Sequence, residues 1–221
     1  MSGWKGRLLT LSLFAVAMAY IESATVVYLR HVYGIQDLLR DAPTQPDALT
    51  PIELGREVAT LVMLGAVGAL AGRAPAARWG LFLYAWGLWD IAYYVWLRVF
   101  IGWPASLGDW DLLFLIPLPW WGPVGAPVLA AGMMMVIGAG IARRSEAGLP
   151  VRVDRTALLL GGIGTAIALY TVLAPALHAL PGGLEAVGRA RPTAFPWGLY
   201  LVGWGMVTLA GLRLAGWVRS P

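Results

Sequence analysis

Hydrophobic residues fill six long runs of the chain, and shorter polar segments separate these runs. The runs cover about 8–30, 52–72, 78–101, 112–142, 156–178 and 195–217. A helix of roughly 20 apolar residues crosses the hydrocarbon core of a bilayer. The pattern therefore predicts an all-α, polytopic membrane protein in which residues 1–221 form one domain of six transmembrane helices. The first run follows Lys5 and Arg7 as a signal peptide would, but it stays apolar to Leu29, so we expect an uncleaved span.

The fourth run is too long for one span, and its first part is rich in proline. Pro117, Pro119, Pro123 and Pro127 each lack a backbone N–H donor. We expect a broken or interfacial segment there, with the true helix beginning near Gly122. Irregular backbone at membrane depth is tolerated where it is buried in protein or lines a cavity.

Composition supports the membrane assignment and excludes several chemistries. Only 13% of the 221 residues are charged, against roughly 25% in soluble domains. The 12 Trp and 8 Tyr suit anchoring at the membrane interfaces. Cysteine is absent, which excludes disulfides, thiolate nucleophiles and Cys-ligated metals. No metal-binding motif is found, so we predict no metal site, and the cofactor stays unknown. The arginines follow membrane topology, as described next, so we predict no nucleic-acid partner.

Positive charge predicts the orientation of the spans. Ten of the 16 lysines and arginines fall on the side of the N-terminus, and this side is expected to be cytoplasmic. Six spans then place both termini in the cytoplasm of a multi-pass protein in the plasma (inner) membrane. The ten residues are Lys5, Arg7, Arg73, Arg78, Arg143, Arg144, Arg152, Arg155, Arg213 and Arg219.

Two of the runs share a motif that includes charged residues. "ESATVVYLRHVYG" begins at Glu22 and "DIAYYVWLRVFIG" begins at Asp90, and both fit acid-x-Ala-x-x-Val-aromatic-Leu-Arg-x-x-x-Gly. This predicts two parallel helical-hairpin repeats, over about 8–72 and 78–142. A fainter third copy would cover 156–217. Eight helical residues rise roughly 12 Å, so Arg30 and Arg98 would lie at the outer headgroups with both acids at equal depth below them.

The uncommon polar residues gather in the outer half of the predicted membrane domain. An ionisable residue inside a membrane marks a functional site by default. We therefore take Glu22 and Asp90 as candidate catalytic acids. The candidate ligand-binding residues are Arg56, Glu57, Trp86, Tyr93, Tyr94, Arg98, Asp111 and His178.

Several functions fit this polar cluster. Its surplus of acids suits a bound cation, a basic ligand or a carboxyl held protonated by its surroundings. The favoured hypothesis is a membrane-embedded enzyme that binds a small or lipid-like ligand and uses a buried carboxylic acid as general acid. One alternative is a small carrier or channel for a cation or a proton-coupled solute. Another is a non-catalytic subunit of a larger membrane complex, or a homo-oligomer, in which the acids only pair with arginines.

A short stretch of the third run has a likeness to known enzymes. Residues 89–94, "WDIAYY", resemble the acid-bearing spans of integral membrane terpene cyclases. The likeness covers six residues, and we assign no family on it.

Overall fold

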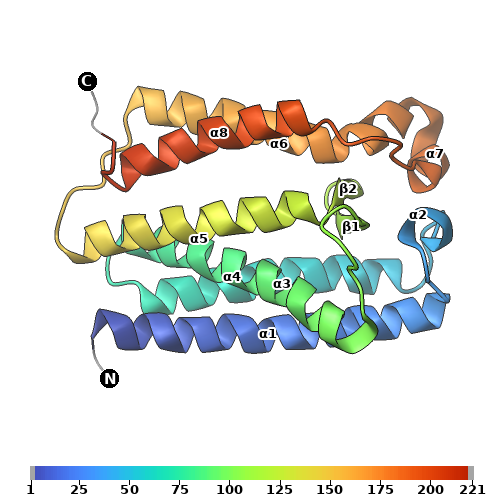
Figure 1. The fold of residues 1–221 in the computed structure, drawn as a ribbon, viewed down its shortest axis with the longest axis horizontal. Helices are drawn as coiled ribbons and strands as arrows, with labels where there is room; N and C mark the ends of the chain where they lie inside the picture. Colours follow the sequence, from blue (N-terminus) through green and yellow to red (C-terminus); the bar gives the residue numbers. More distant parts are fainter. Residues whose placement is uncertain (1–2, 219–221) are drawn as a thin grey trace.

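The computed structural model describes residues 3–218, which are mostly helical (Figure 1). Six long helices lie side by side: α1 (Trp4–Tyr33), α3 (Thr50–Ala71), α4 (Pro75–Ile101), α5 (Gly125–Glu146), α6 (Arg155–Ala179) and α8 (Trp197–Leu214). The shorter elements are α2 (Leu38–Asp41), β1 (Trp110–Phe114), β2 (Trp120–Pro123), the 3₁₀ helix η1 (Leu180–Gly182) and α7 (Gly183–Arg189). α2, α7 and both strands lie at one end of the bundle, and α1 begins and α8 ends at the other.

Four segments are long and apolar enough to cross a membrane. They are α1, α3, α5 and the segment Arg155–Arg189 that begins with α6. α4 and α8 lie alongside them (Figure 1) but are not among the four. In α4, four Trp and three Tyr lower the mean hydropathy, although these rings are compatible with a membrane. The helical, apolar architecture is confirmed, and the count of six spans stays a prediction.

The segment between α4 and α5 corrects the all-α prediction. β1 and β2 pair antiparallel, with Asp111 opposite Gly122 and Leu112 opposite Trp121. Pro117 and Pro119 lie in the connection between the strands, where their missing N–H groups cost no ladder hydrogen bond. α5 begins at Gly125, three residues later than expected. The proline-rich start of the fourth run is therefore a β-hairpin and not a kinked helix.

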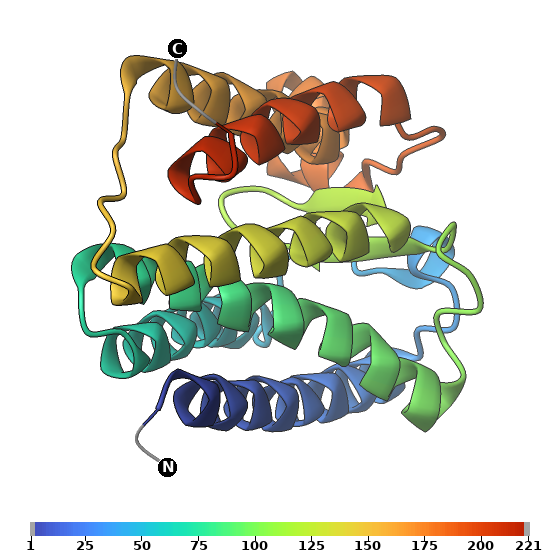
Figure 2. The same ribbon diagram turned by 60° about the vertical axis from the view of Figure 1, so that its left-hand side comes forward.

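The helices pack in two ways. α4 lies closely against α5, and α6 against α8, whereas α1 and α3 both pack on α4 and touch each other little. Figure 2 shows α6 and α8 as a pair on the far side of α5 from α1. In both close pairs, glycines bring the backbones together: Gly80 meets Gly138, and Gly164 meets Gly203. The first two hairpins, which we expected to be repeats, therefore pack differently, and the repeat stays a prediction.

Helix termination explains part of the shared motif. Gly34 ends α1 with φ +66° and Gly102 ends α4 with φ +70°. Each glycine donates its backbone N–H to the carbonyl of the arginine four residues earlier. A left-handed residue is a common way to end a helix, and glycine adopts it without strain. The Arg-x-x-x-Gly spacing thus records two similar helix ends.

The close contact between α4 and α5 yields a testable prediction. A Cβ atom added at Gly138 would lie 2.8 Å from the backbone nitrogen of Tyr84, whereas one added at Gly132 would meet nothing within 4 Å. Overpacking should make Gly138→Ala about 1–3 kcal/mol less stable. Gly132→Ala, in the same helix, should be neutral or stabilising by up to about 1 kcal/mol. Melting temperatures in detergent check this, and equal values for the two variants would contradict the glycine contact.

Candidate functional site

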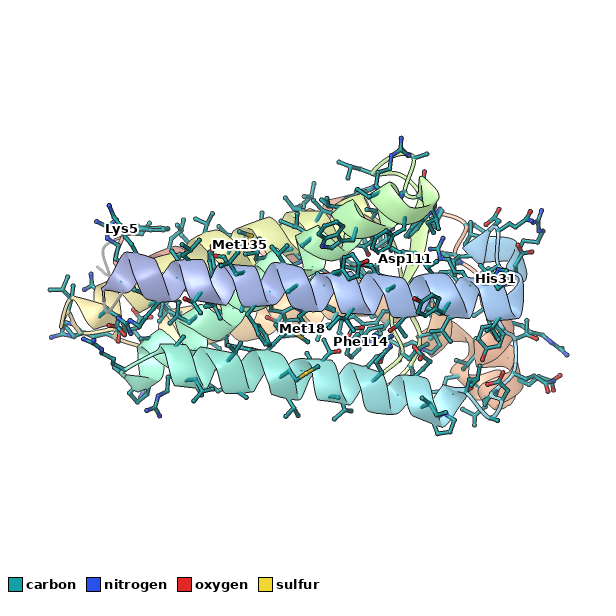
Figure 3. The ribbon with its side chains drawn as sticks, turned by 90° about the horizontal axis from the view of Figure 1, so that it is seen from below. Lys5, Met18, His31, Asp111, Phe114 and Met135 are labelled. Carbon is teal, nitrogen blue, oxygen red and sulfur yellow. The ribbon has the colours of Figure 1, made fainter. Side chains whose placement is uncertain are left out.

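A cavity of about 430 Å³ lies at the end of the bundle that carries α2, α7 and the β-hairpin. Its walls come from α1, α3, α4 and the hairpin, and the segment around α2, α7 and Pro127 of α5 also contribute. The volume is within the range of small-molecule sites. Figure 3 shows Asp111 and His31 near this end and Lys5 near the opposite one.

The structure brings most of the predicted site residues to this cavity. Seven of them line it: Glu22, Arg56, Glu57, Asp90, Tyr93, Tyr94 and Asp111. They come from α1, α3, α4 and β1. The sequence pattern predicted that they lie at a similar depth in the membrane, but not which of them face one another. Most of the other lining side chains are apolar, including Val26, Leu29, Leu54, Leu113 and Phe114.

Three predicted site residues lie elsewhere. Trp86 packs against Phe82, with ring centroids 5.4 Å apart, beside the core of α1, α3 and α4. Arg98 is exposed and donates to the carbonyls of Gly102 and Pro104, so it satisfies acceptors at the end of α4. His178 is exposed, 3.4 Å from the Tyr170 hydroxyl. These three side chains therefore do not line the cavity, and each has a local partner outside it.

Glu22 is fully engaged by neighbouring side chains. Its carboxylate forms an ion pair with Arg56 and accepts a hydrogen bond from the Thr60 hydroxyl. Arg56 also donates from Nε to Glu53, at 2.9 Å. Glu22 is only 5% exposed, whereas Arg56 is half-buried. α1 and α3 make few other contacts with each other. The interactions of Glu22 with Arg56 and Thr60 therefore connect these two helices across the cavity.

Two further acids hold the β-hairpin in place. Glu57 of α3 accepts the backbone N–H of Leu115 at 2.9 and 3.0 Å. Asp111 of β1 accepts a hydrogen bond of 2.8 Å from the Tyr94 hydroxyl of α4. The hairpin is thus attached to α3 and to α4, and it covers the cavity between them.

Asp90 differs from the other acids. Within residues 3–218, its carboxyl group makes no hydrogen bond and no ion pair, although it lines the cavity. Aromatic rings surround it on α4: Trp89 stacks with Tyr93 at 6.1 Å between centroids, and Tyr93 meets Tyr94 edge-on at 5.0 Å. Asp90 is therefore a partly buried acid with free oxygen atoms beside aromatic walls.

Sequence reasoning missed three residues that shape the cavity. Arg30 was expected at the headgroups but is 9% exposed and lines the cavity, with its guanidinium carbon 3.8 Å from the centre of the Trp103 ring. Trp103 follows the end of α4, and no sequence pattern indicated that it would contact Arg30. Thr60, by contrast, could have been predicted from the sequence as a cavity residue, because it lies one turn beyond Glu57 on the same face of α3.

The segment around α2 is anchored over the cavity by polar contacts. The Tyr33 hydroxyl donates to Asp47 at 2.7 Å, and Asp47 also accepts the backbone N–H groups of Leu49 and Thr50. These hydrogen bonds hold the pKa of Asp47 below its usual range, and the one from Tyr33 contributes most. Arg191 donates to the Ala42 carbonyl at 2.7 Å. The outer side of the cavity is thus built from fixed loops.

The described part of the chain offers no group of three or more His, Cys, Asp or Glu side chains placed to hold a metal ion. Comparisons with known proteins give no assignment. No family model matches the chain, and no curated protein or solved structure is significantly similar to it.

Proposed function

We propose that the chain is a six-span membrane protein with the cavity in the outer half of the bilayer. Two observations support this. α4 and α8 run beside the four apolar segments, so the axes of the six long helices are roughly aligned (Figure 1). The end of the bundle away from the cavity carries many positive residues, as cytoplasmic ends do. These include Lys5, Arg7, Arg73, Arg143 and Arg213. Both termini are then cytoplasmic, and the membrane is the plasma (inner) membrane.

The cavity in this proposal binds a small, lipid-like ligand, and Asp90 is a general acid toward it. The observation that carries the proposal is the unpaired carboxyl group of Asp90 beside apolar and aromatic walls. An acid without a partner is costly in such surroundings, so its retention points to a function. A proton on this acid can be transferred to a bound molecule. The faces of Trp89 and Tyr93 can stabilise a positive charge that develops there.

The contacts of the two candidate acids support different roles for them. Glu22 is occupied by Arg56 and Thr60, so its oxygens have partners before any ligand binds. Asp90 has none among the described residues, and it alone is left free to exchange a proton. In this proposal Glu22 is a positioning residue that fixes α1 against α3, and Asp90 is the catalytic acid.

Ligand binding can be tested by filling the cavity. Leu54 lines it, whereas Leu70 of the same helix is 86% exposed on the outer surface of the bundle. We expect apolar molecules to co-purify with the wild-type protein and with Leu70→Trp, and to be lost from Leu54→Trp. Native mass spectrometry and solvent extraction of each protein measure this. Equal occupancy in both variants would show that the molecules bind outside the cavity.

The acid role has its own test. Asp90→Asn keeps the shape of the side chain and removes its proton. We expect the bound molecules of this variant to shift toward unreacted substrate. Asp154→Asn, at the opposite end of the bundle, is the matched control and should carry the wild-type mixture. An unchanged mixture in Asp90→Asn would overturn the catalytic role while leaving the binding proposal in place.

A further inference from the structure

Within residues 3–218, Arg30 has buried hydrogen-bond donors without an acceptor. Its side chain lines the cavity and is about nine-tenths buried, and its Nε and Nη2 atoms are buried without a hydrogen-bond partner among residues 3–218. A guanidinium carries five N–H donors in a fixed plane. Buried donors are nearly always satisfied, so an unsatisfied pair beside a cavity indicates that a bound molecule supplies the acceptor.

The charge of Arg30, in contrast, is already balanced. Asp111 places Oδ1 at 3.9 Å from Nη2 of Arg30, which is close enough for an ion pair and too far for a hydrogen bond. The other oxygen of Asp111 is occupied by the Tyr94 hydroxyl. Trp103 supports the guanidinium from its face. Arg30 therefore lacks an acceptor and does not lack a counter-charge.

The rest of the cavity disfavours a second anion. Arg56 is shared between Glu22 and Glu53, and Asp90 adds a carboxyl group to which no cation of the described residues is paired. An anionic headgroup would approach several carboxylates at short range in a medium of low dielectric constant. A neutral oxygen can accept from Arg30 without this repulsion.

We propose that Arg30 binds a neutral, carbonyl-type oxygen of an otherwise apolar ligand. The inference rests on the proposed function and names the ligand class of the same cavity. The N–H groups of Arg30 donate to the oxygen, and the plane of Trp103 holds the guanidinium in orientation. Val26, Leu29 and Leu54 face the apolar remainder. Glu22 and Arg30 both line the cavity and lie eight residues apart on α1, so it extends roughly 12 Å along this helix.

Three probes of equal chain length test the proposal: 2-dodecanone, n-dodecane and dodecyl phosphate. Each is titrated into the full-length protein in dodecyl maltoside, and the shift in melting temperature gives the apparent Kd. We expect 2-dodecanone to bind most tightly. Arg30→Lys keeps the charge opposite Asp111 but loses the planar fork. It should weaken 2-dodecanone binding roughly tenfold and leave dodecane binding unchanged.

Two further proteins complete the experiment. Arg98→Lys changes the arginine at the equivalent motif position outside the cavity, and it should bind every probe as the wild type does. Arg30→Met combined with Asp111→Leu removes the charged pair together, which keeps the test valid if Arg30→Lys folds poorly. It should lose the preference for 2-dodecanone over dodecane.

The outcomes separate this inference from the function on which it rests. Equal binding of dodecane and 2-dodecanone would overturn the role of Arg30 and leave an apolar binding site. Tightest binding of dodecyl phosphate, lost in Arg30→Lys, would overturn the neutral class in favour of an anionic one. If no probe shifts the melting temperature of the wild-type protein, both the inference and the proposed binding function are wrong.

Discussion

Glu22→Gln is expected to lower the free energy of unfolding by about 3 kcal/mol, whereas Asp90→Asn should change it by less than about 1 kcal/mol. The reason is the difference in their partners. Glu22 is 5% exposed and paired with Arg56, and its neutralisation leaves a partly buried guanidinium with only Glu53 to balance it. Asp90 has no such partner among the described residues, so the amide leaves no charge behind. Melting in detergent, followed by size-exclusion chromatography, measures both effects.

Glu185→Gln provides the background value for an acid-to-amide change. Glu185 is exposed on α7, where it pairs with Arg189, four residues later, and accepts a long hydrogen bond of 3.5 Å from the Gln45 side chain. Its replacement should alter stability by a few tenths of a kcal/mol, as for other exposed helical pairs. If Asp90→Asn melts as low as Glu22→Gln, then Asp90 has a structural partner and is not the free acid of the site.

Asp111→Ala is expected to destabilise the protein by about 3–5 kcal/mol. Both Asp111 and Arg30 are at least nine-tenths buried, and the substitution leaves the guanidinium without its carboxylate. It also removes the acceptor of the Tyr94 hydroxyl, which then remains buried and unsatisfied. Asp109→Ala, two residues earlier in the loop before β1, is the matched control and should cost much less, because among the described residues the Asp109 side chain accepts hydrogen bonds only from Ala105 and Ser106 of the same loop.

Replacing both members of the pair should recover most of this loss. Arg30→Met with Asp111→Leu removes the two charges and fills similar volume, and such exchanges of buried pairs are often neutral. Unfolding of the single and double variants gives the coupling energy between the two residues. Additive effects in this cycle would show that Arg30 and Asp111 do not interact, and would weaken the argument that the charge of Arg30 is balanced.

The sequence predicted the long helices well because each depends on a local property, the run of apolar residues. It predicted the hairpin poorly. Residues 112–142 form one continuous apolar run, and strand pairing within its first part depends on contacts such as that of Asp111 with Gly122, which no local pattern reveals. The prolines correctly indicated that a regular helix could not continue there.

The two motif arginines show that the sequence does not predict which side chains point into the cavity. Arg30 and Arg98 occupy the same motif position, and both precede a glycine that ends a helix. Arg30 is buried because Trp103 and Asp111 pack over it, and both lie far away in the sequence. Arg98 has no such cover and turns to nearby carbonyls. Depth along a helix can be read from spacing, but the direction of a side chain depends on its tertiary neighbours.

The uneven packing of the helices gives the molecule uneven stiffness. Where Gly80 meets Gly138, backbone lies against backbone, and any sliding of α4 along α5 would force carbonyl and amide groups into collision. α1 rests on α4 through side chains, which can change rotamer, whereas α3 meets the α4 backbone at Gly68, where an added Cβ would lie 2.8 Å from the backbone nitrogen of Phe82. We expect changes in the width of the cavity to fall mainly on α1, while α4 keeps Asp90 at a fixed height. The proposed ligand site would then accept molecules of different width with Asp90 held in the same place.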